Sequence, residues 1–205
     1  MVDFTVAIPT YNGSCYLPQI LARLRSQSST QHFSWEVIIV DNNSTDDTAK
    51  IVQTYQAQWP EAYPLRYCLE TEQGLAFARQ RAIDEAHGDL VGFLDDDILP
   101  ELDWVAAAFS FGQEHPQAGA YNGQIHADFE VKPPDNFDRI KSFFAIRERG
   151  ETPNLYKPET LSLPPGAGLV VRRQVWQESV PKRLSLIGRV NGSQLAGEDF
   201  EALLY

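Results

Sequence analysis

The stretch Leu-Val-Gly-Phe-Leu-Asp-Asp-Asp-Ile-Leu-Pro, residues 90–100, decides how the rest of the chain is interpreted. An apolar run of strand length leads directly into three consecutive carboxylates, and the proline that follows prevents a regular strand ladder from continuing. Carboxylates this close together raise one another's pKa values unless a cation lies among them. Two interpretations are open at this point: a solvated acidic turn, or a divalent-metal site completed by a substrate phosphate.

The composition limits the classes of protein to which the chain can belong. Its 205 residues, 43% of them hydrophobic, suffice for one sizeable domain with a real core. The net charge of −11 argues against general nucleic-acid binding, so a phosphate-bearing ligand would have to be held locally. The two cysteines lack CxxC spacing, and no window approaches the roughly 18 apolar residues of a membrane span. We therefore expect a cytoplasmic protein without a transmembrane segment, for which peripheral association with the inner face of a membrane stays open.

Alternating strand and helix patterns surround the acidic stretch in the first half of the chain. Apolar runs predict strands at Phe4–Pro9, Trp35–Val40, Leu65–Leu69 and 90–94, and each is followed by apolar residues at helical spacing. Four consecutive strand–helix units predict an open, mostly parallel α/β sheet joined by right-handed crossovers. Ligands of such sheets bind at the carboxyl ends of the strands, where the acidic stretch lies.

The character of the sequence changes after Ala127. Asp128–Pro165 carries six prolines and mixed charge, which predicts a long irregular excursion with room for one short helix. Before it we expect a strand around Ala118–Ile125, and after it a strand over Gly166–Arg172. A last helix begins on acidic residues in 197–205, and its apolar end indicates truncation at the C-terminus.

Two common nucleotide-binding motifs are absent from the sequence. The turn after the first strand has the single glycine Gly13, where a dinucleotide fold needs GxGxxG, and no Gly-Lys-Ser or Gly-Lys-Thr exists for a P-loop. The predicted sheet must therefore bind a nucleotide by other means.

Five motifs in a fixed order resemble those of a family 2 glycosyltransferase with the GT-A fold. They are Val-Ala-Ile-Pro-Thr-Tyr-Asn (6–12), Val-Asp-Asn-Asn-Ser-Thr-Asp (40–46), Gly-Leu-Ala-x-Ala-Arg (74–79), Phe-Leu-Asp-Asp-Asp (93–97) and Gly-Glu-Asp (197–199). The resemblance covers nearly the whole chain and favours the metal-site interpretation of the acidic stretch. It implies a single GT-A domain over 1–205, with a nucleotide-sugar-binding half at 1–127 and an acceptor-side half at 128–205.

The resemblance also implies which side chains bind the nucleotide. These are Pro9, Thr10, Tyr11, Asn12, Asp41, Asn43, Gly74, Arg79, Asp95 and Asp96. Asp41 would hydrogen-bond the base or ribose. Ser44 and Asp47 resemble the capping box of the following helix, which would leave Asp41 available for this role. Asn43 stands where the family more often has glycine, and Arg79 would face the nucleotide or its diphosphate.

Three further groups of residues receive roles from the resemblance. Asp97, together with Asp95, would hold Mn²⁺ or Mg²⁺. Gly166, Ala167 and Gly168 resemble a small-residue segment beneath the donor sugar and acceptor, although an ordinary turn before a strand would have the same composition. Asp199 matches the general base of the family, and Glu198 would lie near the acceptor.

The implied activity is that of an inverting, metal-dependent glycosyltransferase in polysaccharide or glycoconjugate biosynthesis. It would move a sugar from a nucleoside diphosphate donor, with a UDP-sugar favoured, to a hydroxyl of a saccharide or lipid-linked acceptor. One alternative is a nucleotidyl- or phosphotransferase on a similar sheet, which would not need Asp199. Another is a degenerate sugar-nucleotide-binding sensor or scaffold, against which the intact acidic positions 95–97 and 199 argue.

Overall fold

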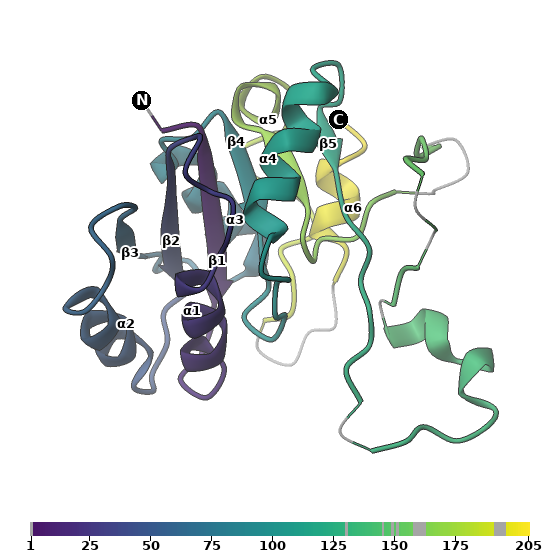
Figure 1. The fold of residues 1–205 in the computed structure, drawn as a ribbon, viewed down its shortest axis with the longest axis horizontal. Coiled ribbons are helices and arrows are strands. Elements are labelled where there is room, and N and C mark those ends of the chain that lie inside the picture. The colour runs from purple at the N-terminus through teal and green to yellow at the C-terminus, as the bar shows by residue number, and fades with distance from the viewer. Residues whose placement is uncertain are drawn as a thin grey trace.

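The computed structural model of the protein describes residues 2–129, 131–144, 146–148, 150, 152–157, 163–190 and 196–205. Its centre is one six-stranded sheet in the order β3-β2-β1-β4-β6-β5 (Figure 1). The strands are β1 (Phe4–Thr10), β2 (Trp35–Asp41), β3 (Leu65–Leu69), β4 (Leu90–Phe93), β5 (Ala120–Tyr121) and β6 (Val170–Arg172). The first four are parallel, as predicted, whereas β6 runs antiparallel to both of its neighbours.

Helices cover both faces of this sheet. The helices α1 (Leu17–Arg25), α2 (Thr48–Gln56) and α4 (Trp104–Glu114) pack on one face, and α3 (Leu75–Glu85), α5 (Arg173–Ser179) and α6 (Glu198–Ala202) on the other. Alternation along β1 explains the two layers, because Val6 and Ile8 face the first group of helices and Ala7 the second. Every residue of β1 and β2 is buried, as the continuous apolar runs predicted. No helix in the described ranges is long and apolar enough to cross a membrane.

The second half of the chain is less regular than we predicted. The strand expected over Ala118–Ile125 is reduced to β5, because the Asn122 side chain beyond it donates to the carbonyls of Pro165 and Ala167 instead of continuing a ladder. The strand expected over Gly166–Arg172 begins only at Val170, after Gly168 with φ of +72°. The helix α5 was not predicted.

The excursion extends away from the sheet in Figure 1. It contains two short 3₁₀ turns, Phe137–Arg139 and Lys141–Phe144, where we expected one helix. Ile125 and Arg147 form an isolated antiparallel bridge near its two ends. The prediction of an irregular Asp128–Pro165 segment is only partly covered, because residues 130, 145, 149, 151 and 158–162 lie outside the described ranges.

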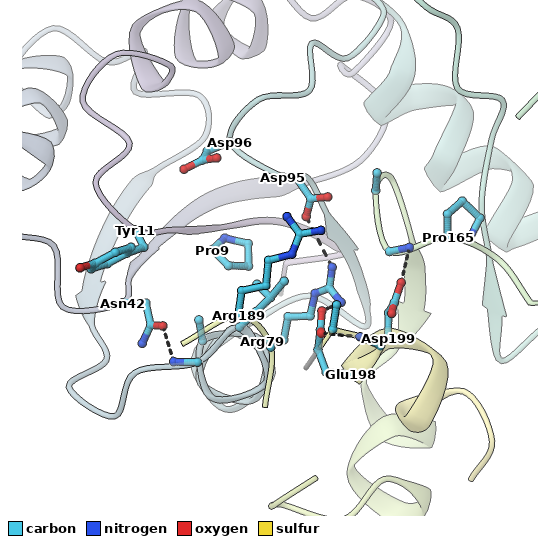
Figure 2. A pocket seen from close by; sticks show the side chains of 18 of the residues that line it. Pro9, Tyr11, Asn42, Arg79, Asp95, Asp96, Pro165, Arg189, Glu198 and Asp199 are labelled. Carbon is cyan, nitrogen blue, oxygen red and sulfur yellow. Dashed lines mark hydrogen bonds and ion pairs between the residues drawn. The ribbon is translucent and has the colours of Figure 1, made fainter. Parts of the chain in front are cut away.

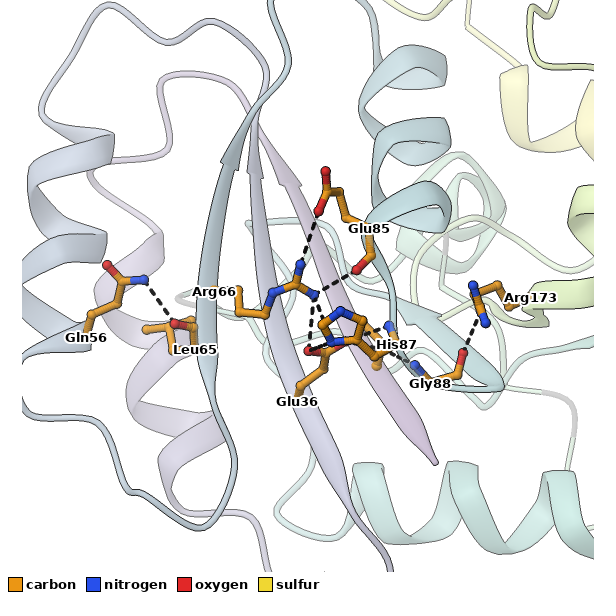
Figure 3. A network of polar contacts seen from close by, with 9 residues as sticks. Glu36, Gln56, Leu65, Arg66, Glu85, His87, Gly88 and Arg173 are labelled. Carbon is orange, nitrogen blue, oxygen red and sulfur yellow. Dashed lines mark hydrogen bonds and ion pairs between the residues drawn. The ribbon is translucent and has the colours of Figure 1, made fainter. Parts of the chain in front are cut away.

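A buried ionic network connects the strands near the amino ends of β1, β2 and β3 (Figure 3). The carboxylate of Glu36, which is fully buried, accepts hydrogen bonds from the Thr5 hydroxyl at 2.9 Å and the His87 backbone N–H at 2.8 Å. The Arg66 guanidinium donates to Glu36 at 3.2 Å and to the Glu85 carbonyl at 2.7 Å. A buried charge is tolerated only when it is paired in this way. The network lies at the end of the sheet opposite the ligand-binding edge expected from the sequence.

Candidate active site

A cavity of about 670 Å³ opens at the carboxyl ends of the parallel strands, a size typical of small-molecule sites. Its lining includes the predicted residues Pro9, Thr10, Tyr11, Gly74, Arg79, Asp95, Asp96, Asp97, Gly166, Ala167, Glu198 and Asp199. The predicted residues Asn12, Asp41, Asn43 and Gly168 do not line it. Segments far apart in the chain therefore converge on one edge of the sheet.

The acidic loop after β4 forms one part of the lining. The Asp96 carboxylate accepts a hydrogen bond from the Thr10 hydroxyl, and Gly13 leaves room for this pair because a Cβ there would collide with both side chains. Burial raises the pKa of Asp96 against the effect of this hydrogen bond, and repulsion from Asp95 and Asp97 adds to the rise. Burial likewise raises the pKa of Asp95.

Arg79 connects this loop to the C-terminal helix α6 (Figure 2). Its side chain is only 3% exposed and donates to Glu198 at 3.1 Å and to Asp95 at 3.4 Å. Its guanidinium also lies over the ring of Phe93, 5.6 Å from the centroid. Burial raises the pKa of Asp95, and the positive charge of Arg79 partly offsets this rise. Arg79 and Glu198 thus form an internal ion pair in the wall of the cavity.

Asp199 follows Glu198 in the first turn of α6 and lies beside the ion pair of Arg79 and Glu198. Its Oδ2 accepts the Gly166 N–H at 3.0 Å and its Oδ1 accepts the Phe200 N–H at 2.9 Å, so the backbone orients both oxygens. A Cβ at Gly166 would lie 2.5 Å from Arg79 Nη2 and 3.0 Å from Asp199 Oδ2. The glycine therefore makes room for these two side chains of the protein itself.

The loop after β2 is arranged differently from our expectation. Asp41 is only 2% exposed, and its carboxylate accepts hydrogen bonds from the Ser44 N–H and the Tyr67 hydroxyl, both at 2.8 Å. The predicted capping box is wrong: α2 begins at Thr48, whose N–H is bound by Asp46 at 3.0 Å. Ser44 therefore does not cap α2 and does not free Asp41 for a ligand, and the nucleotide role of Asp41 stays a prediction.

Two asparagines of these loops have left-handed backbone conformations. Asn12 has φ of +55° and Asn43 has φ of +64°, a region in which asparagine is the best tolerated residue after glycine. This explains how asparagine fits at position 43, where the family more often has glycine. The Asn12 side chain accepts the Thr45 N–H at 2.8 Å and so joins the β1 and β2 loops.

Several residues that line the cavity were not predicted from the sequence. Asn42 is 5% exposed, accepts the Gly74 N–H at 2.7 Å and donates to the Glu72 carbonyl at 2.7 Å, so it fixes the loop before α3. Its place beside Asp41 was visible, but nothing in the sequence distinguishes which of the adjacent polar residues points inward. Arg147 and Arg189 also line the cavity, from segments without periodic pattern or motif.

The acidic loop has the chemistry of a hard-cation site, although the ligands are not gathered. In the part of the chain that the structure describes, no three His, Cys, Asp or Glu side chains are arranged to hold a metal ion. Asp95, Asp96 and Asp97 nevertheless line one cavity, and carboxylate oxygens are the ligands that Mg²⁺ and Mn²⁺ prefer. A divalent cation would offset the burial and repulsion that raise the pKa values of Asp95 and Asp96.

Known proteins are similar to this chain in sequence and in fold. The putative teichuronic acid biosynthesis glycosyltransferase TuaG of Bacillus subtilis is 34% identical over 133 residues, which are 65% of this chain and 51% of that protein. The chain thus spans about half the length of this relative. A crystal structure of S. aureus TarS matches 98% of this chain and 54% of its own with a TM-score of 0.68 at 21% identity.

A third likeness is the mannosyltransferase PcManGT from Pyrobaculum calidifontis, solved in complex with GDP-Man and Mn²⁺. It matches with a TM-score of 0.64 and 25% identity over 90% of this chain and 49% of its own. These likenesses confirm the predicted GT-A fold. The model of glycosyl transferase family 2 matches residues 5–178, which include the β1, β2 and β4 ends that form the cavity. The chain belongs to glycosyl transferase family 2.

Proposed function

We propose that this chain is a glycosyltransferase that moves a sugar from a nucleoside diphosphate donor to a hydroxyl acceptor. The observation that carries the proposal is that the acidic loop Asp95–Asp97 and the oriented carboxylate of Asp199 line the same cavity. Family membership supports it. S. aureus TarS has been solved with UDP-GlcNAc and PcManGT with GDP-Man, and each of these molecules carries a sugar on a nucleoside diphosphate.

The donor would lie along the carboxyl ends of β1 and β4. Pro9, Thr10 and Tyr11 and the backbone at Gly74, which line the cavity, would contact the nucleoside. We favour UDP as the nucleotide, as the resemblance of the motifs implies. Asp97 has no side-chain partner among the described residues, and together with Asp95 it would hold Mn²⁺ or Mg²⁺. Such an ion supplies positive charge that stabilises a departing diphosphate.

Asp199 would act as the general base. Two backbone N–H groups hold its carboxylate in place, so it can receive the proton of an acceptor hydroxyl without reorienting. The acceptor oxygen forms a bond to the anomeric carbon while the bond from that carbon to the diphosphate oxygen breaks. A single displacement of this kind inverts the configuration at the anomeric carbon.

The acceptor side includes Ala167 and the segment around Gly166, and we propose a saccharide or lipid-linked acceptor in polysaccharide or glycoconjugate synthesis. We also propose a cytoplasmic location, with peripheral contact to the inner face of a membrane where a lipid-linked acceptor would reside. Neither a nucleotidyl- or phosphotransferase nor a sugar-nucleotide sensor would need an oriented carboxylate at Asp199.

The test compares nucleotide binding with turnover in an Asp199→Asn variant. Calorimetry of UDP with and without Mn²⁺ should give the same affinity in the variant and the unmodified protein, because Asp199 does not serve the nucleotide. Hydrolysis or transfer from a panel of UDP- and GDP-sugars should fall by about 10²-fold or more. Asp103→Asn, a change at an exposed aspartate outside the cavity, is the matched control. Retained turnover in Asp199→Asn would show that Asp199 is not the general base. Nucleotide binding without turnover in the unmodified protein would favour the sugar-nucleotide sensor.

A further inference from the structure

The cations of the cavity are unequal in their surroundings. Arg79, Arg147 and Arg189 line it, alongside the carboxylates of Asp95–Asp97 and Glu198–Asp199. A nucleoside diphosphate brings further negative charge into this acidic site, so the cation that meets it matters for binding. The resemblance to the family assigns this role to Arg79, but the geometry of the side chains does not support that assignment.

Arg79 is already engaged by the protein. Its two terminal nitrogens donate to Glu198 and Asp95, and its side chain is only 3% exposed. Turning toward a ligand would leave the buried carboxylate of Glu198, only 5% exposed, without its cation. The backbone of Gly166 also presses against the guanidinium, since a Cβ there would lie 2.5 Å from Nη2. Arg79 is therefore part of the wall of the cavity.

Arg189 has the opposite surroundings. It is exposed and makes no hydrogen bond or ion pair with any residue that the structure describes. Figure 2 shows its side chain extending across the cavity toward the acidic loop, with Pro9 beside it. Its guanidinium is thus available to an anion that enters beside Asp95 and Asp96.

The backbone before Arg189 is anchored to the nucleotide side of the cavity. The Ile187 carbonyl accepts the Ala76 N–H at 3.3 Å. A Cβ at Gly74 would lie 2.7 Å from this carbonyl, and a Cβ at Gly188 would lie 3.0 Å from the Leu75 backbone N. Both glycines have positive φ, +144° and +95°, so the close approach depends on glycine at each position. This packing of two backbones holds Arg189 over the start of α3.

We infer that Arg189 binds the diphosphate of the donor and that Arg79 is a positioning residue that holds the Glu198–Asp199 turn of α6. The inference rests on the proposed function and assigns separate tasks to two arginines of one cavity. A guanidinium binds a phosphate through two parallel N–H groups, which matches an exposed arginine better than a buried, doubly paired one.

The first experiment measures binding of UDP and of uridine, each with Mn²⁺, by calorimetry. Arg189→Gln should weaken UDP binding about 10- to 100-fold, because a charge-assisted pair is lost, and should leave uridine binding unchanged. Lys182→Gln is the matched control, because it removes the same charge from an exposed side chain outside the cavity. Equal loss in Lys182→Gln would show a general effect of net charge and would overturn the assignment to Arg189.

The second experiment separates positioning from binding. Arg79→Lys should change the affinity for UDP by no more than about threefold but lower kcat for donor turnover by about 10²-fold with little change in KM. If Arg79→Lys does not fold, Glu198→Gln breaks the same ion pair from its other end and should give the same pattern.

The outcomes distinguish this inference from the proposed function. Weak UDP binding in Arg79→Lys together with normal binding in Arg189→Gln would reverse the assignment and overturn the inference, while the proposed function would stand. An unmodified protein that binds none of the nucleoside diphosphates would overturn both. Normal UDP binding and loss of kcat in Arg79→Lys, with the converse in Arg189→Gln, would support the inference.

Discussion

One added methyl group at Gly166 tests how tightly the cavity wall is packed. The Cβ of an alanine there would lie 2.5 Å from Arg79 Nη2, 3.1 Å from Arg79 Cζ and 3.0 Å from Asp199 Oδ2. The backbone at Gly166 does not have positive φ, so the alanine itself is not strained. Any effect of Gly166→Ala therefore comes from the displacement of these two side chains.

The magnitude follows from two opposing contributions. Forcing an extra methyl group into a packed site costs about 1–3 kcal/mol. Replacing glycine by alanine at a compatible backbone position also restricts the unfolded chain, which stabilises the protein by about 0.4–1 kcal/mol. We expect the free energy of unfolding to fall by about 1–2 kcal/mol on balance. A shift of Asp199 by about 1 Å would in addition lower turnover by about 10²-fold.

Urea denaturation at equilibrium measures the first quantity, and turnover of a donor sugar nucleotide measures the second. Gly123→Ala is the matched control, because a Cβ at Gly123 meets no atom within 4 Å. We expect this control to be as stable as the unmodified protein or slightly more stable, with full turnover. If Gly166→Ala behaved like Gly123→Ala in both assays, the contacts among Gly166, Arg79 and Asp199 would not constrain the site as described.

Two further predictions concern stability alone. Hydrogen bonds from Ser14 and Thr48 outweigh the effect of burial and lower the pKa of Asp46 to about 2. Asp46 should contribute about 1 kcal/mol to the free energy of unfolding, after allowing for its exposure. This contribution should be present above pH 4 and disappear as the pH falls toward 2. In urea denaturation, the free energy of unfolding of Asp46→Asn should therefore approach that of the unmodified protein over this pH range. Glu36→Gln should lower the free energy of unfolding by about 3 kcal/mol, because it leaves Arg66 without its buried anion. If the free energy of unfolding fell no more than it does for a surface substitution, the network would not stabilise the fold as described.

Local patterns were enough to predict most of the first half of the fold. The segments that form β1 to β4 are apolar because helices cover both faces of the sheet. The composition of each segment alone therefore predicts that it is buried. The place of β6 between β4 and β5 is set by pairing between residues far apart in the chain, such as the Phe93 N–H and the Leu169 carbonyl at 2.8 Å. No single segment carries that information.

The candidate site divides in the same way. The acidic loop was predicted because carboxylates beside a strand end are conspicuous in sequence, whereas the role of Asp199 was implied by the resemblance of Gly-Glu-Asp (197–199) to a family motif. The same resemblance pointed to Arg79, but the pairing of Arg79 with Glu198 joins positions 119 apart and could not be predicted from either motif. Arg189 was missed because only the three-dimensional path of an irregular segment brings it over the cavity.

The position of β6 has a consequence for the order in which the sheet and the cavity form during synthesis. The four parallel strands are present once residue 93 has left the ribosome, but β5 is an edge strand that pairs with β6 alone among the described strands. Residues 170–172 must therefore emerge and insert beside β4 before β5 can join the sheet. The same insertion brings Gly166 against Arg79 and Asp199. A nascent chain consequently acquires its acidic loop early and its complete cavity only after the segment around Glu198 and Asp199 has been synthesised.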